Sequence, residues 1–184
     1  YVPIFYRRDR LRLIRQGTFW LSPSPDSAGS RGWDAALPRI ATWAEFRDRA
    51  TGKDFFYFNT HFDHIGVRAR QESSALILRK ISALAGGRPV ILSGDFNSTR
   101  QEGAYLELVR EPEGMKDSEM LSVNGHYGGS QSFTGFNDAL QPNYLIDFIF
   151  VKGIRRAANH GLVAERWDGR FVSDHYPVIV DIYL

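Results

Sequence analysis

Polar residues that could handle a phosphate or a metal ion follow a short apolar run near the middle of the chain. The run 90–92 leads into Gly-Asp-Phe-Asn, which places Asp95 and Asn97 at the end of an expected buried strand. Residues two apart point to the same side of an extended backbone, so both side chains could reach one pocket. Asp95 could hold a metal or a water, and Asn97 could donate to an anionic oxygen. The same residues also fit a strand followed by an Asx turn.

Three other short motifs carry polar residues in strand-like surroundings. Asn-Thr-His follows an aromatic run and contributes His61, and Ile-Asp-Phe-Ile places Asp147 inside an apolar run. Ser-Asp-His, with Asp174 and His175, precedes the last apolar run of the chain. A buried carboxylate without a partner would cost several kcal/mol, so Asp147 requires one.

Taken in order, these four motifs resemble those of the endonuclease/exonuclease/phosphatase superfamily, which includes deoxyribonuclease-like enzymes. The resemblance covers essentially the whole chain, and the stretches 19–22 and 32–34 are similar to a bacterial branch of unassigned substrate. It implies an α/β fold, a four-layer α/β sandwich in which two mixed β-sheets pack face to face with helices outside. It also implies that the sandwich is N-terminally incomplete here.

The resemblance assigns each polar residue a role in a metal-dependent phosphoesterase. His175 acts as general base or polarises the phosphate, and Asp147 orients its imidazole. Asp95 orients or deprotonates water, and His61 donates to a phosphoryl oxygen or to the leaving group. Asp174 is the expected metal ligand. The expected ion is Mg²⁺ or Mn²⁺, because oxygen-rich ligands suit these ions.

Three residues are expected to contact the substrate. Asn97 is implied to touch the phosphate. Arg39 begins a predicted strand and could clamp phosphate, because a guanidinium matches phosphate oxygens in bidentate fashion. Phe136 lies in the loop before Asp147 and could stack on a substrate ring, although aromatic residues in such a chain usually pack in the core.

The predicted function is hydrolysis of a phosphodiester, as in nucleases and phosphodiesterases. One alternative is a phosphomonoesterase acting on a sugar- or inositol-phosphate, and another is a binding module that keeps the pocket without catalysis. The motifs address the phosphate and leave the rest of the substrate open between nucleic acid, lipid head group and small molecule. No feature indicates an obligate protein partner.

Length and composition fit one globular domain over residues 1–184. The chain is 43% hydrophobic and 14% aromatic, which suffices for a sizeable core. Its 23 basic and 21 acidic residues nearly cancel, so attraction to nucleic acid would require a local patch. It has no cysteine, which leaves both cytoplasm and export open. No apolar run approaches the roughly 18 residues that a membrane-spanning helix needs.

The chain starts at Tyr1 in a strand-like stretch, which predicts that the domain is entered after its first strands. The resemblance implies that the missing part carries a strand with an Asn and an element with a metal-binding Glu. These 184 residues alone are therefore expected to be inactive and to expose an unpaired sheet edge.

The elements that must position these residues alternate between strands and helices. Periodicity predicts helices over 67–85 and 102–110, and loops over 22–32 and most of 116–142. Strands are predicted as a hairpin-like pair over 10–15 and 19–21, a hairpin over 39–46 and 54–59, and further segments at 90–92, 132–134, 145–151, 160–164 and 178–184.

Overall fold

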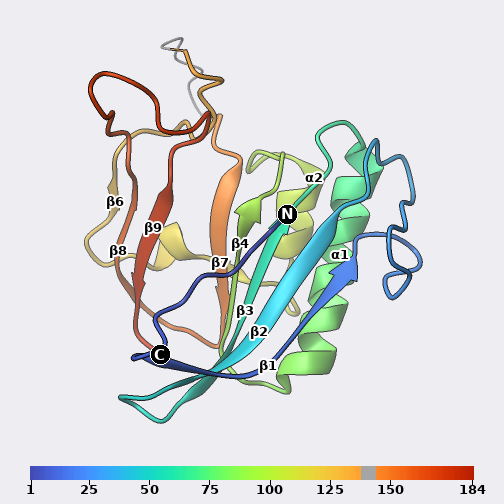
Figure 1. The fold of residues 1–184 in the computed structure, drawn as a ribbon, viewed down its shortest axis with the longest axis horizontal. Coiled ribbons are helices and arrows are strands. Elements are labelled where there is room, and N and C mark those ends of the chain that lie inside the picture. The colour runs from blue at the N-terminus through green and yellow to red at the C-terminus, as the bar shows by residue number, and fades with distance from the viewer. Residues whose placement is uncertain (138–143) are drawn as a thin grey trace.

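The larger of two β-sheets contains six strands. The computed structural model describes residues 1–137 and 144–184 and is drawn in Figure 1. The strands run in the order β1-β2-β3-β4-β7-β5. Their bounds are β1 Leu11–Trp20, β2 Ile40–Asp48, β3 Asp54–His61, β4 Val90–Asp95, β5 Lys116–Asp117 and β7 Asp147–Lys152.

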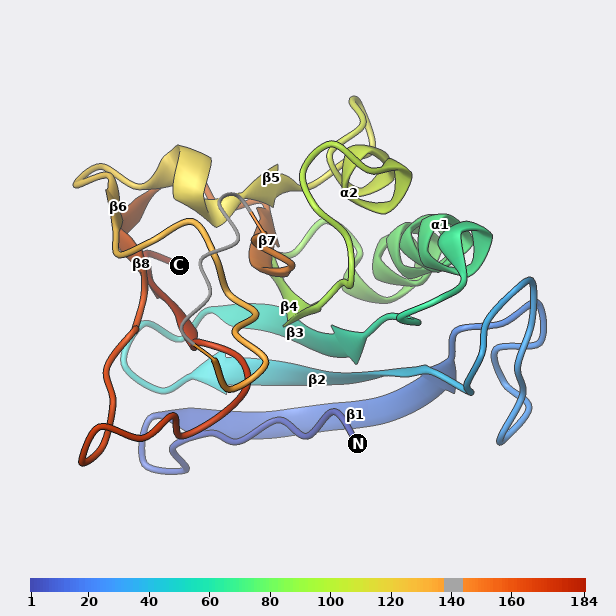
Figure 2. The same cartoon turned by 90° about the horizontal axis from the view of Figure 1, so that it is seen from above.

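The smaller sheet has the order β6-β8-β9. Both α-helices lie on one face of the large sheet, as Figures 1 and 2 show. The small sheet packs on the opposite face, where the two sheets share an apolar cluster. The predicted α/β sandwich of two mixed sheets is thereby confirmed. The remaining elements are β6 His126–Tyr127, β8 Ala157–Leu162, β9 Val178–Ile182, α1 Val67–Ala85, α2 Gly103–Leu108 and the 3₁₀-helix η1 Ser118–Leu121.

Strand alternation divides the side chains of the large sheet between its two faces. The helix-covered face packs against α1 and is mostly apolar, with fully buried rings at Phe56, Phe58 and Phe150, although it also carries the buried Glu45. On the other face the apolar residues Phe55 and Ile91 meet the small sheet. Residues 1–6 run over this second face in Figure 1, and the Pro3 carbonyl accepts a hydrogen bond from Asn59 Nδ2 at 2.8 Å.

The strands β3 and β4 are parallel and are joined by α1, which brings their C-terminal ends to the same edge. Gly94 is required at this edge, because a Cβ atom there would lie 2.2 Å from the Thr60 carbonyl oxygen. The glycine of Gly-Asp-Phe-Asn thus lets the two strands approach and places Asp95 beside His61.

Most predicted elements are present with shifted ends. The helix 67–85 is confirmed without change, while the second helix is shorter than expected. The hairpin-like pair over 10–15 and 19–21 is wrong, because a single strand β1 continues through Gly17. That glycine does not turn the chain; it lies under Trp43, whose Nε1 would stand 2.8 Å from an added Cβ.

The predicted segment 132–134 forms one bridge, Phe133 with His175, and no regular strand in the described ranges. The expected loop over 116–142 contains the short elements β5, η1 and β6, and its part from 138 to 143 lies outside the described residues. Across the two described stretches, none of the helices is long and apolar enough to cross a membrane.

Candidate active site

Three predicted site residues form one row across the large sheet. In the strand register, His61 on β3 pairs with Asp95 on β4, and Asp95 pairs with Asp147 on β7. All three side chains line one cleft on the face opposite the helices. The row lies where β3 and β4 end and β7 begins, so the polar groups meet at one edge of the sheet and leave the core apolar.

His175 joins the row from the segment before β9. Its Nδ1 lies 2.7 Å from Asp147 Oδ2, and its ring packs edge-on against Phe133 with 5.0 Å between centroids. The backbone N–H of His175 also donates to Ser173 Oγ at 3.1 Å. These contacts fix the imidazole and supply the partner that the Asp147 carboxylate requires.

Asp95 lies at the centre of the group. Its Oδ2 is 3.2 Å from His61 Nε2 and 3.9 Å from His175 Nε2. Its Oδ1 accepts the backbone N–H of Asn97 at 2.8 Å, which is an Asx turn. The turn and the polar pocket are therefore not alternatives, because the turn holds the carboxylate in the pocket.

Burial and neighbouring charges shift the pKa values within the group. The pKa of Asp95 is raised to about 6, first by burial and then by the Asp147 charge. The pKa of His61 is lowered to about 4 by burial, with the Arg39 charge adding to the effect. The hydrogen bond to Asp147 raises the pKa of His175 above its usual value. Near neutral pH, Asp95 is then ionised and His61 is a neutral hydrogen-bond donor or acceptor.

The donor set fits a divalent cation. Asp95, Asp147 and His175 offer ligand atoms that all lie within 4.8 Å of one another. The repulsion between the two carboxylates, visible in the raised pKa of Asp95, is the kind of energy that a bound cation removes. Two carboxylates favour a hard ion that prefers oxygen.

Asp174 is not a member of this group of ligand atoms. Its carboxylate accepts a hydrogen bond from Ser173 Oγ at 3.3 Å, and its backbone carbonyl accepts from the N–H groups of Thr134 and Gly135. Asp174 adds to the charge that raises the pKa of His175. Its role as a metal ligand stays a prediction.

The three expected substrate contacts are placed differently from one another. Asn97 is not in an extended backbone, as had been expected, but has φ 45° just past β4. Its Nδ2 donates to the Phe62 carbonyl at 3.1 Å and approaches Asp95 Oδ2 at 3.5 Å, so the amide braces Asp95. Phe136 is 62% exposed and lies outside the lining of the cleft. Their contacts with a substrate stay predictions.

Arg39 lies close enough to the row to lower the pKa of both His61 and Asp95. Its Nη2 is 3.0 Å from His64 Nδ1, and its Nε is 3.5 Å from Asp63 Oδ2. Asp63 is itself held by several backbone N–H groups, which keep its pKa far below the usual range despite its burial. The Arg39 guanidinium is therefore positioned by a fixed anion beside the predicted phosphate site.

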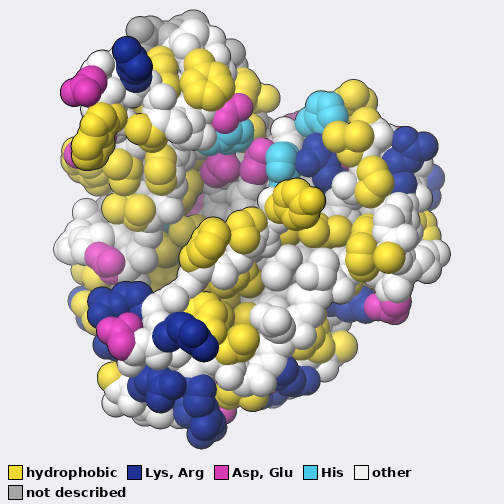
Figure 3. Space-filling view, in the orientation of Figure 1, with side chains coloured by type: hydrophobic (Ala, Val, Ile, Leu, Met, Phe, Trp, Pro, Cys, Tyr) yellow, Lys and Arg dark blue, Asp and Glu magenta, His cyan; other side chains and the backbone are white. Residues whose placement is uncertain are grey.

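The cleft has a volume of about 450 Å³. Figure 3 shows acidic and histidine side chains gathered in a hollow between the part of the molecule that carries β8 and β9 and the part that carries α1. On the same face, Tyr57 and Ser93 extend the polar lining of the cleft toward the apolar cluster that contains Phe55 and Ile91.

Sequence reasoning missed several residues that line or support the cleft. The Tyr57 hydroxyl donates to Ser93 Oγ at 2.9 Å, and Ser93 Oγ lies 3.2 Å from Asn59 Oδ1. A period of two counted back from His61 and Asp95 could have found all three. No sequence signal pointed to Phe133, because its contact with His175 depends on the path of a loop.

Comparison with known proteins points to one family. The model described as "Endonuclease/Exonuclease/phosphatase family" matches residues 4–175. An endonuclease/exonuclease/phosphatase structure from Bacteroides vulgatus is 40% identical with a TM-score of 0.89, and covers 97% of this chain and 68% of that one. A mannosyl-6-phosphatase from Bacteroides thetaiotaomicron is 34% identical with a TM-score of 0.87, and covers 97% and 69%.

Among curated proteins, Nocturnin from Drosophila melanogaster is 29% identical over 110 residues. The match covers 58% of this chain but only 16% of the fly protein. The chain therefore spans a small part of that relative and about two thirds of the two bacterial structures.

Proposed function

Because this chain belongs to the endonuclease/exonuclease/phosphatase family, we propose that it hydrolyses phosphate esters at the group formed by Asp95, Asp147 and His175. Members of the family are hydrolases that act on phosphoester bonds and generally use divalent metals. The observation that carries the proposal is the paired contact of His175 with Asp147 beside the partly buried carboxylate of Asp95, whose pKa is raised to about 6.

Asp95 and Asp147 would hold the cation, which when bound would neutralise charge on the phosphoryl oxygens. The expected ion is Mg²⁺, or Mn²⁺ in its place, because the ligand atoms are carboxylate oxygens.

The protein's own side chains divide the remaining work. Asp95, ionised above pH 6, accepts a hydrogen bond from the attacking water and orients it. His175, whose pKa is raised by its hydrogen bond with Asp147, polarises a phosphoryl oxygen through Nε2. His61, neutral near pH 7, sits within reach of the same space and donates to an oxygen of the phosphate or leaving group.

The phosphate is bound by the groups described above, and the rest of the substrate decides specificity. Hydrolysis of a phosphodiester is our first candidate, since a cleft of about 450 Å³ leaves room for a group on each side of the phosphate. A sugar-phosphate monoester is the second candidate. It is favoured by the similarity of 34% over nearly the whole chain to a mannosyl-6-phosphatase.

A substrate panel with and without metal tests the proposal in the complete protein. Bis(p-nitrophenyl) phosphate represents diesters, and mannose 6-phosphate and inositol phosphates represent monoesters. Activity should disappear in excess chelator, return with Mg²⁺ or Mn²⁺, and be lost again in Asp95→Asn, while the fold survives each treatment. Full turnover in chelator would refute metal dependence. Binding of these esters with no turnover of any would favour the non-catalytic binding module.

We further propose that a glutamate outside these residues completes the metal site. The test compares residues 1–184 with a longer natural form that includes the preceding segment, using the substrate that the panel identifies. The shorter form is expected to be catalytically inactive. Equal activity of both forms would show that the ligands described above suffice.

A further inference from the structure

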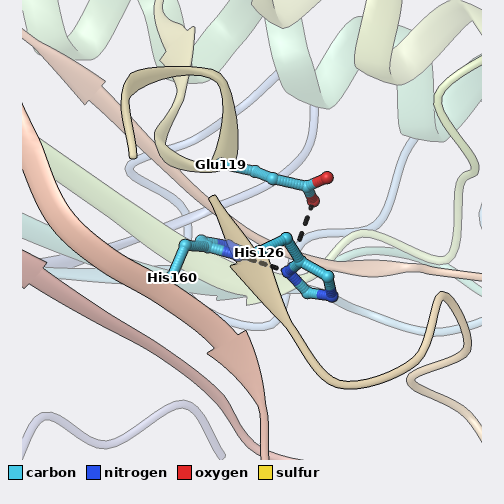
Figure 4. A group of neighbouring side chains, drawn as sticks. All are labelled: Glu119, His126 and His160. Carbon is cyan, nitrogen blue, oxygen red and sulfur yellow. Dashed lines mark hydrogen bonds and ion pairs between the residues drawn. The ribbon is translucent and has the colours of Figure 1, made fainter. Parts of the chain in front are cut away.

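A second group of metal-binding side chains lies where β6, β8 and η1 meet. Glu119 comes from η1, His126 from β6 and His160 from β8, and the two histidines are register partners in the parallel β6–β8 pair. Their ligand atoms all lie within 4.8 Å of one another. Figure 4 shows the three side chains converging. The cleft that contains Asp95 is lined by none of them.

One distance between the donor atoms is shorter than the ligand-to-ligand distance in a tetrahedral metal site, and another is longer. His126 Nδ1 is 2.8 Å from His160 Nδ1 and 3.9 Å from Glu119 Oε2. Ligands about 2.0–2.1 Å from a tetrahedral Zn²⁺ stand about 3.3–3.4 Å apart. Two of the three separations therefore lie within roughly half an ångström of that geometry, and the third, between His160 and Glu119, is at most 4.8 Å.

The tautomer of His126 is set by a backbone carbonyl. His126 Nε2 lies 2.9 Å from the Gly129 oxygen, and since a carbonyl only accepts, Nε2 carries the hydrogen. In the neutral ring, Nδ1 then carries a lone pair, which accepts a hydrogen from His160 Nδ1 in the metal-free chain. A bound ion would take the place of that hydrogen. A ligating histidine that donates its other N–H to a carbonyl is the usual arrangement around protein-bound metals.

The charges around the group favour a cation. Arg100 donates to both Glu119 and Asp117, so two carboxylates face one guanidinium. The hydrogen bonds of Arg100 also hold the Glu119 carboxylate in place, as ligating carboxylates commonly are. A pocket of about 110 Å³ lined by Arg100, Glu119 and His126 gives an ion access and leaves room for a water as a fourth ligand.

We propose that Glu119, His126 and His160 bind one Zn²⁺ ion. Two imidazoles and one carboxylate suit zinc and similar transition ions, in contrast to the oxygen-rich group in the cleft. The ion would tie β6 and η1 to β8. The segment after β6 carries Ser132, whose Oγ accepts the Asp147 N–H at 3.2 Å, and Phe133, which packs on His175. Zinc would thus brace the segment that supports the cleft, and this holds whatever reaction the cleft performs.

Calorimetric titration of the metal-free chain with Zn²⁺ in excess Mg²⁺ tests the proposal. One ion should bind per chain, and the melting temperature should rise by about 5 °C at a zinc concentration about 100-fold above Kd. His126→Asn and His160→Asn should weaken binding at least about 100-fold. Asp95→Asn, which alters only the cleft group, and His64→Asn, an exposed histidine outside both groups, should retain it.

Equal zinc affinity in the wild-type chain and in folded His126→Asn and His160→Asn variants would overturn the proposal, as would loss of binding in Asp95→Asn alone. If the histidine variants fail to fold, the absorption of Co²⁺ bound to the wild-type chain decides the question. Intense visible bands, typical of a four-coordinate site, support it, and the weak bands of a six-coordinate ion refute it.

Discussion

The two faces of the large sheet are built from the same strands but have different roles. On the helix-covered face, β7 places Phe148 and Phe150 in a continuous aromatic core with Phe96. On the other face the same strand carries Asp147 at its first position and then Ile149 and Val151. The first face is mostly apolar, although it carries Glu45 paired with Arg15 and Arg88. The second face is polar at the end that carries Asp147 and apolar toward the other end of the sheet.

This difference shows how the fold positions charged groups at little cost to its core. The row His61, Asp95 and Asp147 lies at the end of the strands, on the face that solvent reaches through the cleft. The aromatic core behind it anchors the backbone of every residue in the row. Substitutions on the helix face should therefore affect stability, and substitutions in the row should affect catalysis.

The largest expected effect is on turnover, from the pair Asp147 and His175. In the complete protein, Asp147→Ala and His175→Ala should each lower kcat by about 10³–10⁴-fold, because one orients the other. The double variant should be no worse than the worse single variant. Steady-state kinetics measure this, with Asp181→Ala on β9 as a control for removal of a carboxylate. Losses that multiply in the double variant would contradict the pairing.

The next largest effect is on stability, from the helix face. Phe150 is fully buried and packs against Phe96 and Tyr105 with ring centroids 5.2 and 5.4 Å apart. Phe150→Ala should lower the free energy of unfolding by about 3–5 kcal/mol, while kcat per folded molecule stays within about threefold. Urea unfolding and active-site titration measure the two quantities, and Phe150→Leu should lose less. A tenfold loss of kcat in folded Phe150→Ala would show that the two faces are not independent.

Replacing Asp95 should have opposite effects on stability and activity. The Asp95 carboxyl has a pKa of about 6 in the folded protein and 3.8 in the unfolded chain, so it binds its proton more tightly in the folded protein. Its contribution to stability therefore falls as pH rises from about 4 to 6. In metal-free protein at pH 8, Asp95→Asn should therefore be more stable than wild type by about 2 kcal/mol, although inactive. Near pH 4 the two should be equally stable.

The measurement is the difference in unfolding free energy between the two proteins at each pH. A difference is needed because His61, with its pKa lowered to about 4, contributes a stability term of the opposite sign, which rises between about pH 4 and 6.5. A difference that does not change with pH would show that Asp95 does not titrate near 6. Excess Mg²⁺ should reduce the difference if Asp95 binds the ion.

The sequence predicted the sandwich and the residues of the row better than it predicted their surroundings. Motif order identified His61, Asp95, Asp147 and His175, which the fold brings together, although their roles stay predictions. Local pattern could not show that Asn97 leaves the extended conformation. That depends on an Asx turn and on the Phe62 carbonyl of another segment.

Long-range packing explains the other differences. The stretches 10–15 and 19–21 were expected to form a hairpin-like pair, but they are one strand, and the indole of Trp43 on the neighbouring strand occupies the space above Gly17. The group of Glu119, His126 and His160 has no motif, because its members come from three short elements that only the fold brings together. Residues that act through tertiary contacts were therefore the ones missed.

The smallest expected effect concerns Ser93, which lies two residues before Asp95 on β4. It tests how far the polar part of the cleft extends along the strands from the row of His61, Asp95 and Asp147. Ser93 accepts the Tyr57 hydroxyl hydrogen and lies 3.2 Å from Asn59 Oδ1. Ser93→Ala removes a partner from two cleft-lining groups, so it should cost about 1–2 kcal/mol of stability and raise KM by about two- to fivefold without changing kcat. Ser74→Ala on the helix side, where Oγ donates to the Ala104 carbonyl at 2.8 Å, should cost a similar amount of stability and leave KM unchanged. A KM that rises equally in both variants would mean that the effect comes from general loosening of the fold. A KM that rises only in Ser93→Ala would show that the substrate site extends from the row to Ser93 and Tyr57.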